Sequence, residues 1–340
     1  MVAERIEQNS TLSEPILEVQ GLTKHFPAGG SGLPGSHTPM IHALDDVSFV
    51  LRPGRVTALV GESGSGKSTV ARLLAQLYPP TSGRIFFHGE DVSRVRGRSA
   101  RLKYRAQVQM IFQDPFGSLN PVKRIEYDIA RPLKIHKVVP ANQVRSRVLE
   151  LLQTVGLVPP DEIARKYPHQ LSGGQRQRVN IARALAVQPA VLLADEPISM
   201  LDVSIRMGIL NLMLDLKQKE NIAFLYITHD IASARYVADE VIVMYAGQVV
   251  EQGETDAVLQ TPLHPYTRLL LSAVPNPERG FTHTEEMARG EAPTVIDPKD
   301  ICRFSPRCPV AVEASFCKMP QLVEAQPGHW VRCHLYPQPN

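Results

Sequence analysis

The chain has 340 residues, which exceeds the length at which a single hydrophobic core stops growing, so we expect one large domain and an appended region. Hydrophobic residues make up 43% and charged residues 21% of the sequence, a composition that excludes a chain disordered throughout. The formal net charge of +3 is small, and Lys and Arg are scattered, so charge gives no reason to expect nucleic acid as a partner.

The beginning of the chain, residues 1–14, is polar, and we expect it to form a flexible tail. It lacks the apolar core of a signal peptide, so we expect the chain to stay in the cytosol. The longest apolar runs, 191–194 and 241–245, have the length of strands and fall short of the ~18 apolar residues that span a bilayer. Any role at a membrane therefore depends on partner proteins.

The first part of the chain has the alternating pattern of β-strands. Strands are predicted at 16–20 and 42–51, with a Gly-, Ser- and Pro-rich connection at 27–40 between them. A further strand is predicted at 84–87, directly after a turn at 79–83. The opening third of the chain is therefore expected to be rich in strands.

Residues 61–69, Gly-Glu-Ser-Gly-Ser-Gly-Lys-Ser-Thr, lie between an apolar run at 56–60 and a helical pattern at 70–74. They match the phosphate-loop pattern, in which backbone N–H groups and a helix N-terminus surround the phosphates. In that pattern Lys67 reaches the outer phosphates and the Ser68 hydroxyl ligates Mg²⁺. The strand-loop-helix context disfavours the alternative of a glycine-rich turn with a solvated lysine. The pattern predicts a nucleoside triphosphate site made of Gly61, Glu62, Ser63, Gly64, Ser65, Gly66, Lys67, Ser68 and Thr69.

The apolar spacing is mainly helical from 98 to 185, most clearly at 144–155, so we expect a helical lobe inserted into the domain. Strands return at 191–194, 223–227 and 240–245, each before a turn or a helix. This alternation is typical of a largely parallel sheet, and it predicts the α/β fold class.

Two acids, Asp195 and Glu196, end the predicted strand 191–194. In a phosphate-loop enzyme, a strand-end aspartate can hold Mg²⁺ and a neighbouring carboxylate can polarise the attacking water. By themselves, two acids before a proline only mark the end of a strand. Because Lys67 and Ser68 lie upstream, the sequence favours the catalytic interpretation.

Together with the phosphate loop and the two acids, the sequence Leu-Ser-Gly-Gly-Gln at 171–175 resembles the ATP-binding subunits of ABC transporters. The resemblance covers residues 15–255. It implies a P-loop NTPase core of the ABC type with an inserted helical subdomain at about 98–185. It also implies that two chains close head to tail over two ATP molecules, so that each ATP site is completed by the opposite chain.

The same resemblance assigns roles to single residues. It implies that Gln113 contacts Mg²⁺ or water at the outer phosphate and that His229 positions the attacking water beside Glu196. Phe26 stands at the position of the aromatic ring that stacks on adenine, although a core position is the alternative. Read alone, Gln113 is a turn residue, His229 a structural histidine and Ser172 a helix N-cap. The residues implied to contact ATP across the dimer interface are Ser172, Gly173, Gly174, Gln175 and Asp202.

All cysteines lie in the C-terminal region, and their spacing differs from the Cys-x2-Cys knuckles of structural zinc sites. Thiolates suit either Zn²⁺ or an iron–sulfur cluster, and four unconnected thiols are a further alternative. Arg303, Arg307, Lys318 and Arg332 lie near these cysteines and can offset the charge of four thiolates. The candidate ligands are Cys302, Cys308, Cys317 and Cys333.

Residues 264–268, His-Pro-Tyr-Thr-Arg, and the segments around Cys302, Cys308 and Cys333 resemble the C-terminal extension of oligopeptide and dipeptide importer ATPases. The resemblance favours a [4Fe-4S] cluster over Zn²⁺ and implies an extension at 256–340. A role of this region as a redox sensor is a separate hypothesis.

The resemblance implies an ATP-hydrolysing, energy-coupling subunit of a bacterial or archaeal importer for oligopeptides or dipeptides. Such a subunit is peripheral on the cytoplasmic face of the cell membrane. Its implied partners are a second ATPase chain, identical or paralogous, two membrane permease subunits and an extracytoplasmic substrate-binding protein. An importer for nickel or oligosaccharides is one alternative, and a soluble ABC ATPase that acts on DNA or ribosomes is another.

Overall fold

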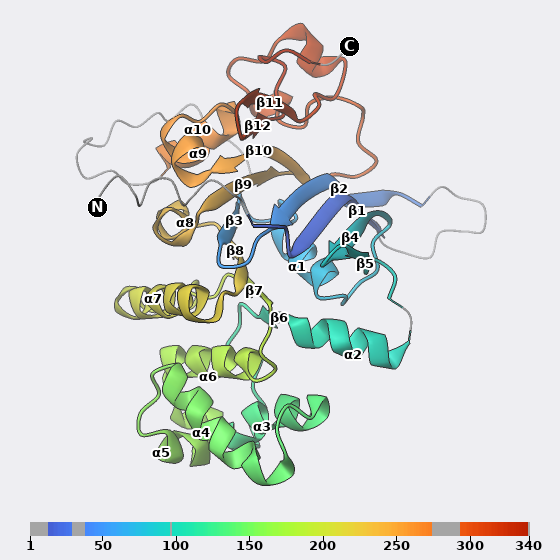
Figure 1. The fold of residues 1–340 in the computed structure, drawn as a ribbon. Helices are drawn as coiled ribbons and strands as arrows, with labels where there is room; N and C mark the ends of the chain where they lie inside the picture. Colours follow the sequence, from blue (N-terminus) through green and yellow to red (C-terminus); the bar gives the residue numbers. More distant parts are fainter. Residues whose placement is uncertain (1–12, 29–37, 96, 274–292, 339–340) are drawn as a thin grey trace, which may run out of the picture.

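The computed structural model describes residues 13–28, 38–95, 97–273 and 293–338. Its strands and helices are arranged around a central sheet, with a helical lobe on one side and the C-terminal region on the other (Figure 1). Most of the expected N-terminal tail, 1–14, and the middle of the connection at 27–40 lie outside the described residues. No helix in the described part of the chain is both long and apolar enough to cross a membrane.

The central sheet contains a parallel core of five strands. These are β3 (Val56–Val60), β6 (Val108–Ile111), β7 (Val191–Asp195), β8 (Ala223–Thr228) and β9 (Glu240–Tyr245), paired in the order β9-β3-β8-β7-β6. Every residue of β3, β7 and β8 is buried, which explains their continuous apolar sequences. The structure confirms the predicted α/β class and the largely parallel sheet.

Strands from the beginning of the domain form an antiparallel sheet. It consists of β1 (Leu17–Pro27), β2 (Met40–Leu51), β4 (Ser82–Phe87) and β5 (Glu90–Asp91), in the order β2-β1-β4-β5. Helix α1 (Lys67–Leu74) follows β3, and its buried side chains share one hydrophobic core with both sheets. This packing fixes the phosphate loop between the two sheets.

The helical lobe is smaller than the sequence predicted. The interval 98–185 is mainly helical, as the apolar spacing predicts, but it also contains the short strand β6, and its first helix, α2 (Arg98–Gln107), packs against the sheet core. Tyr104 of α2 is buried, and its hydroxyl donates a hydrogen bond to the Leu74 carbonyl oxygen at 2.7 Å. The lobe seen in Figure 1 consists of α3 (Ile125–His136), α4 (Val144–Thr154), α5 (Pro160–Arg165) and α6 (Gly173–Leu185).

The remaining helices connect or cover the central sheet. Helix α7 (Val203–Glu220) links β7 to β8, and α8 (Ile231–Val237) links β8 to β9. Helices α9 (Thr255–Gln260) and α10 (Pro265–Ser272) follow strand β10 (Gln248–Glu254). Short 3-10 turns are η2 (Ala141–Gln143), η3 (Pro168–Gln170), η4 (Ser305–Arg307) and η5 (Glu313–Phe316).

The C-terminal region, which the sequence predicts as an appended extension, adds strands to the central sheet. Strands β11 (Val323–Gln326) and β12 (His329–Val331) extend the sheet beyond β10, to which β12 pairs antiparallel. Glu251 of β10 is fully buried and accepts hydrogen bonds from the Leu263 and His264 backbone N–H groups, both at 2.8 Å. Its carboxylate also lies 2.7 Å from His329 Nε2, so one buried acid ties β10, β12 and the segment before α10 together.

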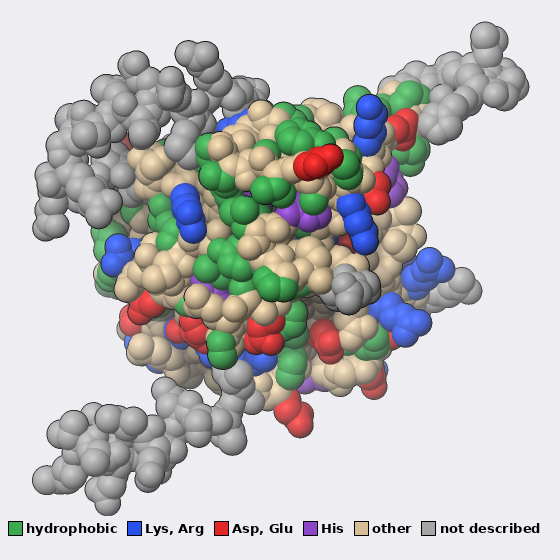
Figure 2. Space-filling view, turned by 90° about the horizontal axis from the view of Figure 1, so that it is seen from above, with side chains coloured by type: hydrophobic (Ala, Val, Ile, Leu, Met, Phe, Trp, Pro, Cys, Tyr) green, Lys and Arg blue, Asp and Glu red, His purple; other side chains and the backbone are tan. Residues whose placement is uncertain are grey.

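Figure 2 shows the face of the molecule that carries the C-terminal region. Hydrophobic side chains reach this surface in several groups between scattered charged ones. Large exposed hydrophobic residues of the region are Val310, Val312, Phe316, Trp330 and Leu335.

Candidate active site

The phosphate loop connects the end of β3 to the beginning of α1, as the motif predicted. Its backbone requires glycine at two positions, because Gly61 has φ 153° and Gly66 has φ 102°. A Cβ atom at Gly61 would lie 2.2 Å from the Met244 carbonyl oxygen, and one at Gly66 would lie 2.6 Å from that of Ala43. The loop therefore has no room for side chains where it turns towards the N-terminus of α1, a position that favours anions.

Lys67 lies inside the loop and is buried. Its Nζ donates hydrogen bonds to the carbonyl oxygens of Gly61 and Glu62, both at 2.8 Å. Burial lowers the pKa of Lys67, while the nearby carboxylates of Glu196 and Asp195 favour its charged form. The loop thus holds a cation at its centre. The Lys67 ammonium can donate its hydrogen bonds to a phosphate oxygen in place of the two carbonyl oxygens.

Two oxygen ligands for a divalent cation lie side by side at the start of α1. The Ser68 hydroxyl donates a hydrogen bond to Asp195 Oδ1 at 2.9 Å. Asp195, at the carboxyl end of β7, is only 4% exposed, and burial raises its pKa while the Ser68 hydrogen bond opposes that effect. A hydroxyl and a carboxylate are the kind of ligands that Mg²⁺ prefers, so the pair fits the predicted metal.

Three predicted catalytic residues meet at the ends of adjacent parallel strands. Glu196 accepts a hydrogen bond from Gln113 Nε2 at 2.9 Å, and its other carboxylate oxygen lies 3.1 Å from His229 Nδ1. Glu196 has φ 46°, a left-handed conformation that is costly for a residue with a side chain, and its N–H is held by the Ile227 carbonyl at 2.9 Å. Because the His229 side chain is 59% exposed, the group opens to solvent, where a water can reach the carboxylate.

Phe26 lies near the end of β1, which belongs to the antiparallel sheet. Its ring meets Tyr78 edge to face, with centroids 5.8 Å apart, and the Lys24 ammonium lies 4.9 Å from its centroid. The ring is half-buried, so part of its surface can stack on a flat base.

The 171–175 segment forms the beginning of α6. Ser172 is the N-cap and accepts a hydrogen bond from the Gln175 N–H at 3.3 Å, while the Gln175 side chain accepts one from the Ser172 N–H at 3.1 Å. The backbone of Gly174 lies against Ile205 of α7, two positions after the helix begins at Val203. Among the described residues, no hydrogen bond or ion pair joins this segment to the phosphate loop. Helix α6 also lies apart from α1 in Figure 1, so the two halves of the predicted ATP site are separate within one chain.

Asp202, also predicted to lie at the dimer interface, is exposed directly before α7. It therefore faces solvent, and its neighbour Leu201 lies near the beginning of α6. Gly173, which precedes Gly174, lies within contact of Leu201 from the same connection. The residues predicted to bind a partner's ATP therefore lie at the beginnings of α6 and α7, which contact each other through Gly173, Gly174, Leu201 and Ile205.

The four cysteine thiols are free in the structure. Cys333 is buried, Cys302 and Cys308 are half-buried, and Cys317 is exposed. Burial raises the pKa of the Cys302, Cys308 and Cys333 thiols, and the proximity of Cys302 and Cys308 adds to the effect at Cys333. Within the described residues, no three cysteine sulfurs all lie within 4.8 Å of one another.

The arginines near the cysteines have partners in the ATPase core, which the sequence did not indicate. Arg307 binds Glu62 of the phosphate loop through both terminal nitrogens, at 2.8 and 3.0 Å. Arg332 binds Asp46 at 3.1 Å, and Arg303 binds Asp45. These three arginines therefore pair with carboxylates of the ATPase core, and their use to offset thiolate charge stays a prediction.

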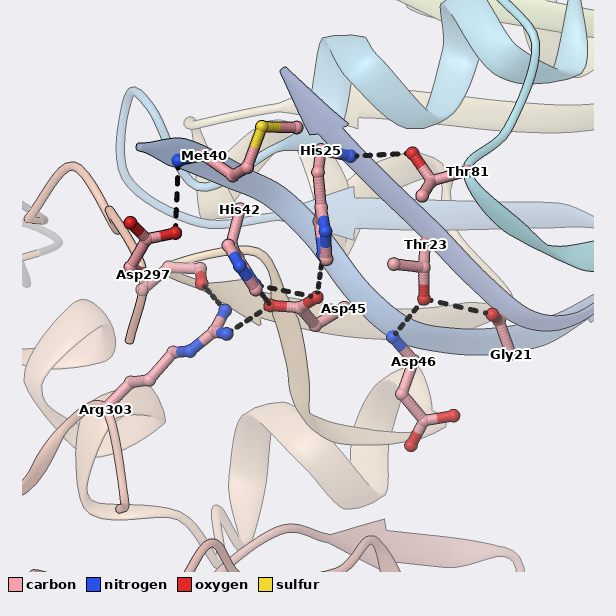
Figure 3. A network of polar contacts seen from close by, with 11 residues as sticks. Gly21, Thr23, His25, Met40, His42, Asp45, Asp46, Thr81, Asp297 and Arg303 are labelled. Carbon is pink, nitrogen blue, oxygen red and sulfur yellow. Dashed lines mark hydrogen bonds and ion pairs between the residues drawn. The ribbon is translucent and has the colours of Figure 1, made fainter. Parts of the chain in front are cut away.

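Asp45 gathers three donors around one carboxylate (Figure 3). His25 Nε2 lies 2.6 Å from Oδ1 and His42 Nδ1 lies 2.9 Å from Oδ2, with the two imidazole rings stacked at 3.6 Å. Burial acts to raise the pKa of Asp45, but hydrogen bonds from Arg303 and the histidines outweigh it, so the pKa is lowered. In the described residues, His25, His42 and Asp45 are the only group of candidate metal ligands whose ligand atoms all lie within 4.8 Å of one another. The Arg303 cation already binds the Asp45 carboxylate.

Two family models match the chain. The ABC transporter family matches residues 44–199, which include the phosphate loop, the 171–175 segment and both strand-end acids. The C-terminal region of oligopeptide/dipeptide transporters matches residues 250–317, which include Tyr266, Arg307 and three of the cysteines.

Curated relatives match almost the whole chain. The probable peptide ABC transporter ATP-binding protein y4tS of Sinorhizobium fredii is 42% identical over 95% of this chain and 91% of its own length. The oligopeptide transport ATP-binding protein AppF of Bacillus subtilis is 43% identical over 95% of this chain and 98% of its own length.

Solved structures agree with the fold. The dimeric ATP-binding cassette MJ0796 bound to ADP and phosphate has a TM-score of 0.61 at 30% identity, covering 70% of this chain and 98% of that one. CbiO1 of Clostridium perfringens, part of an ABC transporter complex, has a TM-score of 0.62 at 30% identity, covering 73% of this chain and 91% of that one. The chain therefore belongs to the family of ABC transporter ATP-binding proteins, and within it to those that carry the oligopeptide/dipeptide transporter C-terminal region.

Proposed function

We propose that the chain is the ATP-hydrolysing, energy-coupling subunit of an importer for oligopeptides or dipeptides. The observation that carries this proposal is the meeting of Gln113 and His229 on the Glu196 carboxylate, next to the Ser68–Asp195 pair at the phosphate loop. Relatives named for peptide and oligopeptide transport, similar over 95% of the chain, support the class of substrate.

In this proposal each residue of the site acts on ATP or on the attacking water. The N–H groups of the phosphate loop and Lys67 bind the phosphates, and Ser68 and Asp195 hold Mg²⁺, with Gln113 alongside. Mg²⁺ supplies neutralisation of charge on the phosphates. Glu196 accepts a proton from the attacking water, and His229 holds that water in line with the outer phosphate. The half-buried face of Phe26 stacks on adenine.

The ATP site is completed by a second ATPase chain. Residues 172–175 and Asp202 are placed to close over ATP bound to the opposite chain, with the N-terminus of α6 facing its phosphates. The separation of the two half-sites within one chain supports this arrangement. It makes hydrolysis depend on a dimer, formed with an identical or a paralogous chain.

We further propose that two permease subunits and an extracytoplasmic substrate-binding protein complete the importer, which places this chain on the cytoplasmic face of the membrane. A groove of about 490 Å³ along α3 offers a docking surface for a permease. It is lined by side chains that include Tyr127, Ala130 and Ile135, and the exposed Phe116 and Val122 lie in the segment before it. That segment follows Gln113, so a docked permease is linked to Glu196 through a short stretch of backbone and the Gln113 hydrogen bond.

The division of the chain that fits this proposal is an ATPase domain at 15–255 and an extension at 256–340. In the extension, Cys302, Cys308, Cys317 and Cys333 are proposed to hold a [4Fe-4S] cluster. Four thiolates at ~2.3 Å from one zinc ion lie roughly 3.8 Å apart, whereas no three of the described sulfurs all lie within 4.8 Å of one another. A four-iron cluster is larger than a single ion and tolerates wider spacing, which supports the cluster over Zn²⁺.

One purification tests the proposal. The tagged full-length chain is purified anaerobically from its native cells, the co-purifying membrane proteins are identified, and iron, sulfide and zinc are measured. We expect two permease subunits and about four iron atoms per chain. Uptake of a labelled tripeptide is then compared in cells with and without the chain. Recovery without membrane proteins, together with unchanged uptake, would overturn the importer role, and zinc in place of iron would overturn the cluster.

A further inference from the structure

The C-terminal region contacts Glu62 at its carboxylate and at its backbone N–H. Its carboxylate accepts hydrogen bonds from both terminal nitrogens of Arg307, at 2.8 and 3.0 Å, in a bidentate ion pair. Its backbone N–H donates a hydrogen bond to the Tyr266 hydroxyl at 2.9 Å. Its carbonyl oxygen accepts a hydrogen bond from Lys67 Nζ at 2.8 Å. One residue of the phosphate loop thus lies between the C-terminal region and the lysine that faces the phosphates.

The ion pair is shielded enough to set the position of the loop. The Arg307 side chain is 12% exposed and the Glu62 side chain 26% exposed, so water screens the pair only in part. The hydrogen bonds that Arg307 donates to Glu62 raise the pKa of Arg307, and burial raises the pKa of Tyr266, which keeps its hydroxyl protonated. Because the arginine fork is planar and rigid, it fixes the carboxylate in direction as well as in distance.

Arg307 belongs to a short segment that is firmly packed on the ATPase core. Phe304 of this segment is buried, and its ring lies 5.2 Å from that of Tyr245 and 5.5 Å from that of Tyr266. Cys302 and Cys308 stand at the two ends of the segment. Both thiols therefore belong to a segment that contacts the phosphate loop.

We propose that Arg307, supported by Tyr266, is a positioning residue that orders the phosphate loop for ATP through Glu62. Through this contact, the Cys302–Cys308 segment is coupled to the affinity for nucleotide. The inference rests on the proposed function, since it assigns a role within the same ATP site. Arg307 contacts neither Ser68, Asp195 nor Glu196, so the contact affects the binding of ATP and leaves the chemical step unchanged.

The test is a double-mutant cycle on the full-length chain. The variants are Arg307→Gln, Arg307→Lys, Glu62→Gln and the double variant with Gln at both positions. Binding of a fluorescent ATP analogue gives the dissociation constant, and steady-state hydrolysis separates KM from kcat. The matched control is Arg332→Gln, which removes another arginine that joins the C-terminal region to the core, away from the loop.

We expect Arg307→Gln and Glu62→Gln each to weaken binding about tenfold, the double variant to be no weaker than either, and Arg307→Lys to recover part of the loss. In the weakened variants KM is expected to rise in parallel with the dissociation constant, while kcat stays within about twofold of the wild-type value. Arg332→Gln is expected to bind the ATP analogue within about twofold of the wild-type affinity. Unchanged binding in Arg307→Gln, additive losses or an equal loss in Arg332→Gln would overturn the inference. Glu62→Gln, at a partly exposed position, provides the same test if the Arg307 variants do not fold.

The coupling to the cysteines is tested in two backgrounds. Cys302→Ser with Cys308→Ser is expected to weaken nucleotide binding in the wild-type chain and to have no further effect in Glu62→Gln. An equal loss in both backgrounds would show that the thiols act by another route. A wild-type chain that fails to bind the ATP analogue would defeat the proposed function itself, whereas wild-type binding with an unaffected Arg307→Gln would defeat only this inference.

Discussion

Gln113 donates a hydrogen bond to the Glu196 carboxylate at 2.9 Å, although the two residues follow different strands, β6 and β7. The contact is possible because β6 and β7 pair in parallel, which brings their carboxyl ends to the same edge of the sheet. Gln113 is itself exposed, at the beginning of the segment that leads to the groove along α3. A shift of that segment therefore changes the surroundings of Glu196 directly.

Asp195→Asn is expected to raise the melting temperature of the nucleotide-free chain by a few degrees. Burial raises the pKa of Asp195 above its ordinary value of 3.8, so protonation favours the folded state. That contribution is complete below pH 3.8 and is lost as the pH rises through the folded pKa, so at neutral pH the charge destabilises the fold. Thermal unfolding with and without Mg²⁺ and ATP measures both effects. A variant that keeps the full stabilisation by Mg²⁺ and ATP would contradict the metal role of Asp195.

Gly66→Ala is expected to weaken ATP binding more than Gly64→Ala does. A Cβ at Gly66 would lie 2.6 Å from the Ala43 carbonyl oxygen, whereas one at Gly64 meets nothing within 4 Å. Both glycines have positive φ, so backbone strain is common to the two variants and the clash separates them. Dissociation constants for a fluorescent ATP analogue give the comparison, with circular dichroism as the control for folding. The opposite ranking would show that the loop is not held in this conformation.

The motifs allowed much of the site to be predicted because they specify both residue types and local structure. The phosphate loop needs glycine at its turns, and the strand-end acids follow a fully buried strand, so both could be placed without the fold. The position of Ser172 as N-cap follows from local hydrogen bonds for the same reason. Local patterns are therefore sufficient wherever the chemistry depends on neighbours in sequence.

Contacts between distant segments could not be predicted in this way. Glu62 and Arg307 are far apart in the chain, and neither belongs to a spacing pattern that points to the other. Strand β12 has only three residues, too few to show an alternation, so its addition to the sheet was missed. For the same reason the four-residue strand β6 was hidden inside an interval that looked helical.

Acid is expected to destabilise the fold through His264. Burial lowers the pKa of His264 to about 4, against an ordinary value of 6.5. Between these values the unfolded chain binds more protons, so stability falls as the pH drops from 6.5 towards 4, by on the order of 3 kcal/mol in total. His264 Nδ1 accepts the Tyr266 N–H at 3.0 Å, and His264→Asn keeps such an acceptor while removing the titration.

Urea midpoints for wild type and His264→Asn, taken at about pH 7 and about pH 5, test this prediction. The wild-type chain should lose more stability between the two conditions than the variant does. Equal losses would place the acid sensitivity elsewhere.

Two inactive variants are expected to complement each other if the ATPase dimer is formed by identical chains. Lys67→Ala removes the cation of the phosphate loop, and Ser172→Arg blocks the surface that closes over the opposite ATP. In an equal mixture, half of the dimers contain one chain of each kind and have one intact site of two, so about one quarter of the wild-type sites return. ATPase rates of the separate and mixed variants measure this recovery.

Recovery only after a paralogous chain is added would assign the second half-site to that paralogue. Failure to recover activity in either mixture would contradict the shared ATP site.

The most direct test of the account is the ATPase rate of Glu196→Gln beside its affinity for ATP. The Gln side chain keeps the size and the hydrogen-bonding position of Glu196 but cannot accept a proton from water. We predict that turnover falls by about 100-fold or more while the dissociation constant for ATP stays within about twofold of wild type. Size-exclusion chromatography with Mg²⁺ and ATP should then show the variant as a stable dimer with its partner chain. A variant that hydrolyses ATP at close to the wild-type rate would contradict the assignment of Glu196 as the catalytic base.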